Sequence, residues 1–486
     1  MTTPARKILR NSFFGIASEA IGGALLFVVF IFIARFLGSE QFGVFSYILA
    51  FVGLFQLIAD FGLTNVIVRE ISRAKDKAAH IMGAIIPLAW LFSLLIFGVI
   101  AFLGSFFSLS EEGYKATLIM GVAVLTTFHS VAYGSVCRAF EEMGFNAVGN
   151  VTHKIVLFLL VLTAIHFECT VVEIAEAFML ANIYQMMFFY IVVSRRYFKL
   201  SLRFDRRYWR YLIKEAFPIG LAMIFRRITL HVDTLLLTAL STTSSVGLFN
   251  AAYKVIQMID MIPFTLSLPL FPPFTRLALE SRERLFSFVT QALSFFMVIA
   301  LPICALMIIL APQIVNLFFG AGYQEAAPTL RMLSCSVVFL FPTALYIYLF
   351  SALGHQKFYT ISSAICLITK AGLDVWLIPL KAHYGAAIAT LSAEIAFFLS
   401  GLIYLWRLGY LLPYLKIIYK PLFAVSISSL ALMLGLFYDK EKTLVVLIAL
   451  VCLYVILYLL LILAFGAVSR RQLTLLEETL RVKHGT

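Results

Sequence analysis

Charged side chains inside long apolar stretches are the residues of this sequence that could do chemistry. A charge that faces lipid at the bilayer centre costs about 2.5 to 3.5 kcal/mol on insertion scales. These side chains must therefore face protein or water, and they either pair with one another or bind an external ion. The cations are Lys154, Arg226, Arg227, Lys254, Arg331 and Lys370, and the acids are Glu19, Asp60, Asp233, Asp260, Asp374 and Glu394.

Depth in the membrane divides these charges into two groups. Lys154, Arg331, Asp60 and Asp233 lie within a turn or two of the end of a predicted span, from which a side chain can reach the interface. The remaining charges lie near the middle of their spans. They are the candidates for a functional site.

Two adjacent arginines, Arg226 and Arg227, are the first candidates. Neighbouring residues point about 100° apart around a helix, so one acid does not easily neutralise both. The planar guanidinium donates two parallel hydrogen bonds to adjacent phosphate oxygens. Lys254, on the next predicted helix, could add a third charge, which favours a site for an anionic ligand. The alternative is internal pairing, of Arg226 with Asp233 and of Lys254 with an acid elsewhere.

Lys370 and Asp374 lie four residues apart on one predicted helix and therefore face the same way. They either neutralise each other or take part in coupling to an ion gradient. Glu19, Asp260 and Glu394 have the same two interpretations, because an intramembrane carboxyl group can bind and release H⁺ or help to hold Na⁺. Glu19 could also pair with the arginines.

The composition shows which elements must position these charges. Of 486 residues, 62% are hydrophobic and 13% are charged, whereas about 25% are charged in soluble domains. Stretches of about 20 apolar residues, the length of a helical span, recur along the chain. We predict an all-α integral membrane protein with about 14 transmembrane helices. They lie near residues 11–34, 41–63, 79–103, 115–137, 149–166, 172–194, 216–238, 245–272, 285–310, 327–352, 357–380, 384–406, 418–437 and 443–466.

The connections between these spans are strongly asymmetric in charge. Most of the Lys and Arg residues outside the spans gather on one side, and the positive-inside rule makes that side, with both termini, cytoplasmic. The same asymmetry explains the net charge of +13 through contact with anionic lipid, so no nucleic-acid partner is expected.

A basic connection at residues 195–215 divides the first twelve predicted spans into two sixes. We therefore predict an N-terminal six-helix bundle at 1–194, a second bundle at 216–407, and two extra helices with a short cytoplasmic tail at 408–486. The segments that begin at Gly43 (GVFSY) and Gly247 (GLFNA) echo each other across this division. With an even number of spans, the two bundles would be parallel repeats around a central cleft.

Motifs for other classes of protein are absent from the sequence. It has no P-loop, dinucleotide fingerprint, triad spacing or metal motif, so we expect neither an enzyme nor a bound cofactor or metal. The six cysteines have no paired spacing and are interpreted as apolar filler. A membrane-embedded transferase would need a catalytic His or acid in a loop, and none stands out.

One segment indicates a family. The run from Arg35 to Gly43 (RFLGSEQFG), followed by an aromatic helix and Asp60-Phe-Gly-Leu63, resembles the bacterial polysaccharide flippases of the Wzx family. This resemblance places the chain among multidrug, oligosaccharidyl-lipid and polysaccharide exporters. It implies two bundles arranged as a V in the bacterial inner membrane.

The resemblance also implies a function. Such a flippase moves undecaprenyl-pyrophosphate-linked oligosaccharides, the repeat units of O-antigen or capsule, to the periplasmic leaflet by ion-coupled alternating access. A polysaccharide polymerase and chain-length machinery would be partners. Arg226, Arg227 and Lys254 would bind the pyrophosphate or an acidic sugar. The alternatives are a lipid II flippase, whose substrate also has a pyrophosphate, and a multidrug cation exporter, whose cavity would be acidic.

Overall fold

The computed structural model describes the backbone of residues 4–60, 63–410, 412–438 and 443–466. It describes their side chains except at 4–13, 57–60, 65 and 216–227. Every regular element in these ranges is helical. The helices are α1 (Pro4–Asp60), α2 (Leu63–Arg73), α3 (Ala78–Phe107), α4 (Glu111–Ala139), α5 (Met143–His166), α6 (Val171–Arg196), α7 (Arg206–Leu240), α8 (Thr243–Ser267), α9 (Phe271–Glu280), α10 (Arg282–Phe319), α11 (Ala326–Ser334), α12 (Val337–Ala352), α13 (Gln356–Arg407), α14 (Tyr414–Tyr438) and α15 (Leu444–Ala464).

The predicted all-α membrane fold is confirmed, but the count of fourteen spans is not. The described residues contain 10 helices that are long and apolar enough to cross a membrane, or 11 if the bent pair α11 and α12 is one span. Two of these helices each contain two predicted spans. α1 is broken at Gly38 (φ 69°, ψ 173°), and α13 is broken at Ala382 (φ 47°, ψ −131°).

The chain folds back sharply within α13. A Cβ atom on Gly385 would lie 2.3 Å from the backbone oxygen of Leu377. Eight residues along a straight helix span about 12 Å, so these two residues can meet only where the helix reverses. The sequence predicts a connection of several residues here, whereas the structure makes the turn with one non-helical residue and one close glycine.

The chain forms two compact units. The first contains Met1–Lys254, Phe318–Tyr323 and Lys370–Ala386, and the second contains Val255–Leu317, Gln324–Thr369 and Ala387–Thr486. Each unit is built from separate stretches of the chain, and the boundary between the units does not fall at the basic connection. The predicted domains, 1–194 and 216–407 with their flanking segments, therefore stay a prediction about an internal duplication.

Within the first unit, the two segments that echo each other in sequence pack together. A Cβ atom on Gly43 of α1 would lie 1.9 Å from the carbonyl oxygen of Thr243, and one on Gly247 of α8 would lie 1.8 Å from that of Ser39. The hydroxyls of Ser39 and Ser244 lie 3.1 Å apart. The contact is reciprocal. Gly43 faces Thr243, which lies four residues before Gly247, and Gly247 faces Ser39, which lies four residues before Gly43.

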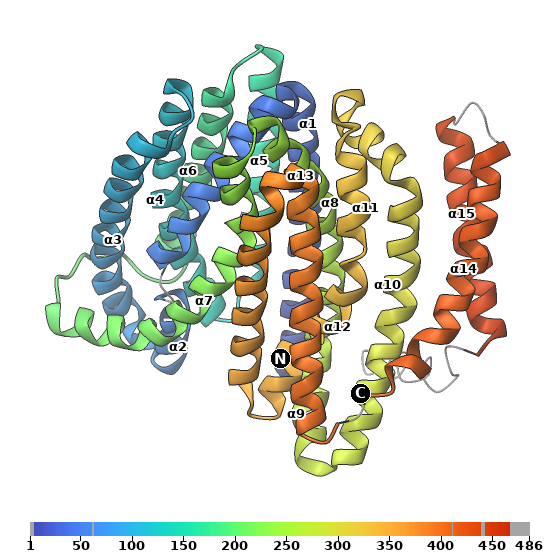
Figure 1. The fold of residues 1–486 in the computed structure, drawn as a ribbon. Helices are drawn as coiled ribbons and strands as arrows, with labels where there is room; N and C mark the ends of the chain where they lie inside the picture. Colours follow the sequence, from blue (N-terminus) through green and yellow to red (C-terminus); the bar gives the residue numbers. More distant parts are fainter. Residues whose placement is uncertain (1–3, 61–62, 411, 439–442, 467–486) are drawn as a thin grey trace. The chain divides into compact units, whose positions relative to one another are not determined.

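Within the second unit, α14 and α15 form a hairpin that lies beside α10 (Figure 1). Pro302 in α10 has no N–H, so the carbonyl of Val298, four residues earlier, loses its helical donor. The Tyr458 hydroxyl of α15 donates to that carbonyl at 2.7 Å. The packing of α15 thus satisfies a backbone group that proline leaves open.

Two further prolines follow the same rule. Pro312 frees the carbonyl of Ile308, to which Arg331 Nε donates at 3.2 Å. In the first unit, Pro87 of α3 frees the carbonyl of Gly83, which accepts from the backbone N–H of Arg203 at 2.9 Å. The sequence predicts only that Arg331 lies near the membrane interface. The structure adds a hydrogen bond from its guanidinium to the backbone of α10.

Candidate functional site

The charged residues that the structure buries most deeply come from α7 and α13. Lys370 Nζ lies 2.5 Å from Asp233 Oδ2, and the two side chains are 4% and 2% exposed. Lys370 also donates to the backbone carbonyl of Thr229 at 3.0 Å, and its ammonium lies 5.6 Å from the centroid of the Tyr253 ring. A buried ion pair with this much support is held in a fixed position.

Asp374, one turn after Lys370, is the third member of this charge cluster. It is fully buried and interacts electrostatically with both Asp233 and Lys370. Its two oxygens accept no hydrogen bond from the residues that the structure describes. If a proton binds to Asp374, the carboxyl of Asp233 is close enough to accept a hydrogen bond from it.

The charge balance of this cluster decides what it can bind. Among the side chains that the structure describes, one ammonium faces two carboxylates, so these three groups together have a net charge of −1 when all are ionised. An uncompensated charge in a buried site costs several kcal/mol. One bound proton removes that charge and supplies the missing hydrogen-bond donor, so the arrangement is suited to taking up and releasing H⁺.

The sequence identifies two of these three residues but not their partner. It predicts Lys370 and Asp374 on one face, which is confirmed by their common interaction, but Lys370 makes its short ion pair with Asp233 instead. The sequence places Asp233 within about two turns of the end of its span, and α7 does end at Leu240. What this position does not show is that the residue is buried in protein, with 1% of its surface exposed. The apolar run that continues after Asp233 is the signal that could have found it.

The predicted anion site is only partly described. Arg226 and Arg227 belong to α7, and the prediction for them falls outside the side chains that the structure describes. Lys254 lies in the same compact unit, with its ammonium 4.0 Å from the centroid of the Phe30 ring. The electron-rich face of the ring attracts the ammonium and helps to hold it in the apolar interior. Binding of an anion by these three residues stays a prediction.

The other predicted coupling residues are dispersed. Glu19 on α1 is exposed and interacts electrostatically with Lys154 on α5, so its partner is this lysine. Asp260 and Glu394 belong to the second compact unit, where each makes polar or electrostatic contacts of its own. The structure therefore does not bring Glu19 into the charge cluster. Among the residues that it describes, no group of three or more His, Cys, Asp or Glu could hold a metal.

Long apolar helices around buried charges define a multi-pass membrane protein, and a solved structure has the same fold. It is described as "Lipid II flippase MurJ, inward closed conformation". The similarity has a TM-score of 0.75 with 16% sequence identity, over 94% of this chain and 99% of the other. At that identity the likeness concerns the fold alone.

Sequence comparison gives the family. The model of the polysaccharide biosynthesis protein family matches residues 8–278, and the chain belongs to that family. A Haloferax volcanii protein named "probable low-salt glycan biosynthesis flippase Agl15" is 22% identical over 79% of this chain and 80% of its own length. A Shigella flexneri protein named "putative O-antigen transporter" is 21% identical over 82% of this chain and 97% of its own. These relatives are flippases and transporters, as the sequence predicts, and not enzymes.

Proposed function

We propose that this protein is a flippase for undecaprenyl-pyrophosphate-linked oligosaccharides. It would move them from the cytoplasmic to the periplasmic leaflet of a bacterial inner membrane, with both of its own termini in the cytoplasm. A polysaccharide polymerase and chain-length machinery would then use the product. The observation that supports this proposal is membership of the polysaccharide biosynthesis family, with relatives named for glycan flipping and O-antigen transport.

The chemistry of the substrate suggests how the residues would divide the work. A pyrophosphate needs concentrated positive charge within the membrane, and Arg226, Arg227 and Lys254 are the proposed source. The sugars need a wet path, whereas the polyprenyl tail can stay in lipid. Lys254 is held in the first compact unit with its ammonium over the Phe30 ring, which places a positive charge one helix away from the two arginines.

We assign coupling to the charge cluster Asp233, Lys370 and Asp374, with H⁺ as the coupling ion. A proton that binds Asp374 converts its carboxylate to a carboxylic acid, which donates to Asp233 and makes the cluster neutral. Release of the proton to the other side returns the cluster to its charged form. The ammonium of Lys370 occupies the position next to the carboxylates that Na⁺ would need, so a proton gradient fits better than a sodium gradient.

The test is translocation of a polyprenyl-pyrophosphate oligosaccharide in sealed liposomes that contain the purified protein. An impermeant glycan-modifying enzyme added outside measures exposure of the sugar. We expect protein-dependent exposure that Arg226→Ala with Arg227→Ala abolishes in a stably inserted protein. Wild-type export by that double variant would overturn the anion site.

The same vesicles test coupling. We expect Asp374→Asn to lose the response to an imposed pH gradient, while Glu325→Gln, a control at a helix N-terminus whose side chain caps nothing, keeps it. Glu19→Gln, Asp260→Asn and Glu394→Gln test the other predicted coupling residues. A response to Na⁺ in place of H⁺, or an unchanged response in Asp374→Asn, would contradict the assignment.

Two alternatives have distinct outcomes in this assay. A lipid II flippase would move lipid II in preference to longer glycans, using the same cations for the same pyrophosphate. A multidrug cation exporter would move no lipid-linked sugar and would transport organic cations instead. The adjacent arginines argue against the exporter, because they would repel such substrates.

A further inference from the structure

A row of cations lies at the start of α7, in the basic connection that the transport mechanism does not use. Arg206, Arg210 and Lys214 follow one another at four-residue spacing, so they line one face of the helix, and all three are exposed. Together with Trp209 and neighbouring apolar side chains, they surround an open cavity of about 540 Å³. The cavity lies where the first turns of α7 cross α3 (Figure 1).

The three cations have no acidic partner among the residues that the structure describes. Other charges close by do have partners. Arg69 of α2 donates to Glu215, one residue after this row, at 2.7 Å and to Glu70 at 3.1 Å. Local acids are therefore used elsewhere, and the row keeps its positive charge free for an external anion.

The floor of the cavity is apolar. It is formed by Leu88, Leu91 and Phe92 of α3 together with Ile213 of α7. Further along α3, Leu94 and Leu95 are 55% and 61% exposed on the span, as is Leu91 at 55%. An alkyl chain that leaves the cavity along α3 therefore stays on an apolar surface.

The backbone holds this cavity in shape. Trp209 Nε1 donates to the carbonyl of Ala84 at 2.7 Å, and the N–H of Arg203 donates to the carbonyl of Gly83, which Pro87 leaves open. Gly83 itself lets the chain approach, since a Cβ atom there would lie 2.3 Å from the backbone oxygen of Ser201. The start of α7 is thus fixed to α3 before any ligand arrives.

We propose that this cavity binds one anionic phospholipid, with its phosphate among Arg206, Arg210 and Lys214 and an acyl chain along Leu88, Leu91 and Phe92. Guanidinium and ammonium groups bind phosphate oxygens strongly, and cations beside a membrane span attract anionic lipid. The apolar floor favours a lipid over a free phosphate, because only a ligand with an alkyl chain gains from contact with it. The site is independent of the proposed transport function.

Trp209 provides a direct probe of this site. In a variant in which Phe replaces the other three tryptophans, Trp209 is the only tryptophan that fluoresces. Quenching of its fluorescence by lipids with brominated acyl chains then reports which lipid occupies the cavity. In vesicles of phosphatidylcholine with a small fraction of brominated phosphatidylglycerol, we expect quenching to exceed the mole fraction of the quencher. At about 1 kcal/mol for each Lys or Arg beside an anionic headgroup, three cations correspond to an enrichment of up to about a hundredfold. Brominated phosphatidylcholine at the same fraction should give no enrichment.

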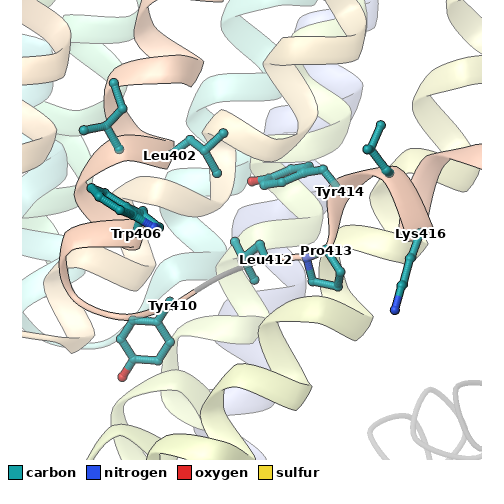
Figure 2. Close-up of a pocket in the computed structure, with 9 residues that line it drawn as sticks. Leu402, Trp406, Tyr410, Leu412, Pro413, Tyr414 and Lys416 are labelled. Carbon is teal, nitrogen blue, oxygen red and sulfur yellow. The ribbon is translucent and has the colours of Figure 1, made fainter.

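A second cavity in the same protein supplies the matched control. Trp406 lines an apolar cavity of about 590 Å³ between the end of α13 and the start of α14, where Lys416 is the only cation among the lining residues that the structure describes (Figure 2). A variant that keeps only Trp406 should be quenched in proportion to mole fraction. Equal enrichment at both tryptophans would show a general surface effect and overturn the specific site.

Charge variants complete the test. Arg206→Gln, Arg210→Gln and Lys214→Gln together should return the quenching of Trp209 to the mole fraction, whereas Arg206→Lys with Arg210→Lys should keep most of the enrichment. Circular dichroism and unchanged Trp emission without quencher show that the variants are folded. Unchanged enrichment in the triple Gln variant would refute the proposal. Binding of inorganic phosphate without any enrichment of brominated phosphatidylglycerol would also refute it, because the site would then be one for a free anion.

Discussion

Backbone carbonyls freed by prolines explain several polar side chains that would otherwise look misplaced. Tyr458 lies in a strongly apolar helix, yet its hydroxyl reaches the one carbonyl of α10 that Pro302 deprives of a donor. A carbonyl left unsatisfied in an apolar interior costs about 1–3 kcal/mol. The tyrosine therefore stabilises the docking of α15 through a single directed bond in addition to its packing.

We expect Tyr458→Phe to destabilise the protein by about 1–3 kcal/mol, because the carbonyl of Val298 then loses its only described donor. Thermal unfolding in detergent, followed by tryptophan fluorescence, measures the loss. In a Pro302→Ala background the helix supplies its own N–H to Val298, so the same substitution should cost much less. Equal losses in both backgrounds would show that the hydroxyl acts elsewhere.

Removing Lys370 should be far more damaging than removing either carboxylate. Lys370→Met leaves two buried carboxyl groups without a counter-charge, and breaking a buried pair in this way costs about 3–5 kcal/mol. Asp374→Asn removes the surplus negative charge and should cost little. Lowering the pH should restore part of the stability of Lys370→Met, because protonation neutralises the carboxylates.

Chemical or thermal unfolding of these variants at two pH values is the measurement. Lys370→Met combined with Asp233→Asn serves as the control, since it removes both partners of the ion pair and should be more stable than Lys370→Met alone. If Lys370→Met were as stable as wild type at neutral pH, Lys370 would not be the counter-charge that holds the two acids.

The sequence identifies which charges lie in the membrane but not which of them meet. Lys370 and Asp374 stand out because four-residue spacing on one helix is visible in any apolar run. The pairing with Asp233 is missed, because helical spacing shows only neighbours on the same helix, and Asp233 lies on α7 whereas Lys370 lies on α13. Tyr458 gives no signal, since the proline that needs it lies more than 150 residues away in the chain.

Reciprocal glycines bring the backbones of α1 and α8 into close contact within the first unit. Because a Cβ atom on Gly43 would collide with the backbone of Thr243, even alanine is too large there. The equivalent collision at Gly247 involves Ser39. Close approach of small residues is a common way for membrane helices to associate, since packing replaces the hydrophobic driving force.

We expect Gly43→Ala and Gly247→Ala each to separate these helices and to reduce both stability and transport severely. Gly15→Ala is the matched control in α1, since a Cβ atom there would meet no other described side chain or helix within 4 Å, and it should be neutral or stabilising by up to about 1 kcal/mol. Unfolding temperature and export from liposomes are measured for all three variants. A folded, active Gly43→Ala would contradict the contact.

Helix breaks are the least predictable elements. The sequence places a connection near each break, but Gly38 and Ala382 turn the chain with single residues in a backbone region with positive φ. Such a conformation suits glycine, whereas for Ala382 it is strained. Hydropathy is averaged over many residues, so the sequence locates each break only to within several residues and does not show that one residue makes the turn.

Across the whole chain, charge asymmetry determines orientation. The connection between α3 and α4, residues 108–110, has no Lys or Arg, whereas residues 195–214, which join the end of α6 to the start of α7, have eight. The positive-inside rule therefore predicts that these two connections lie on opposite sides of the membrane. This orientation is the one that the proposed direction of transport requires.

Reporter fusions test the orientation directly. Alkaline phosphatase, which is active only outside the cytoplasm, should be active when fused after Leu109 and inactive when fused after Lys199. A green fluorescent reporter, which folds in the cytoplasm, should give the opposite pattern at the same two positions. Activity of the phosphatase after Lys199 would invert the topology and with it the proposed direction of transport.

Composition and hydropathy are sufficient for the class of fold, and one short segment is sufficient for the family. The all-helical membrane architecture and the likeness to polysaccharide flippases are confirmed. The organisation into compact units is not predictable, because the first unit takes in Phe318–Tyr323 and Lys370–Ala386 from distant parts of the chain. Which distant stretches join one unit depends on tertiary packing, and hydrophobic periodicity in the sequence does not show it.

The carbonyls freed by prolines have a consequence for how this sequence can evolve. Loss of Pro302 removes the need for a hydroxyl at Tyr458, and loss of Pro312 removes one reason to keep Arg331. Each pair should therefore vary together among relatives, with proline and donor gained or lost as a unit. Pro87 should show no such dependence on the side chain at Arg203, because its donor is a backbone N–H that every residue except proline provides.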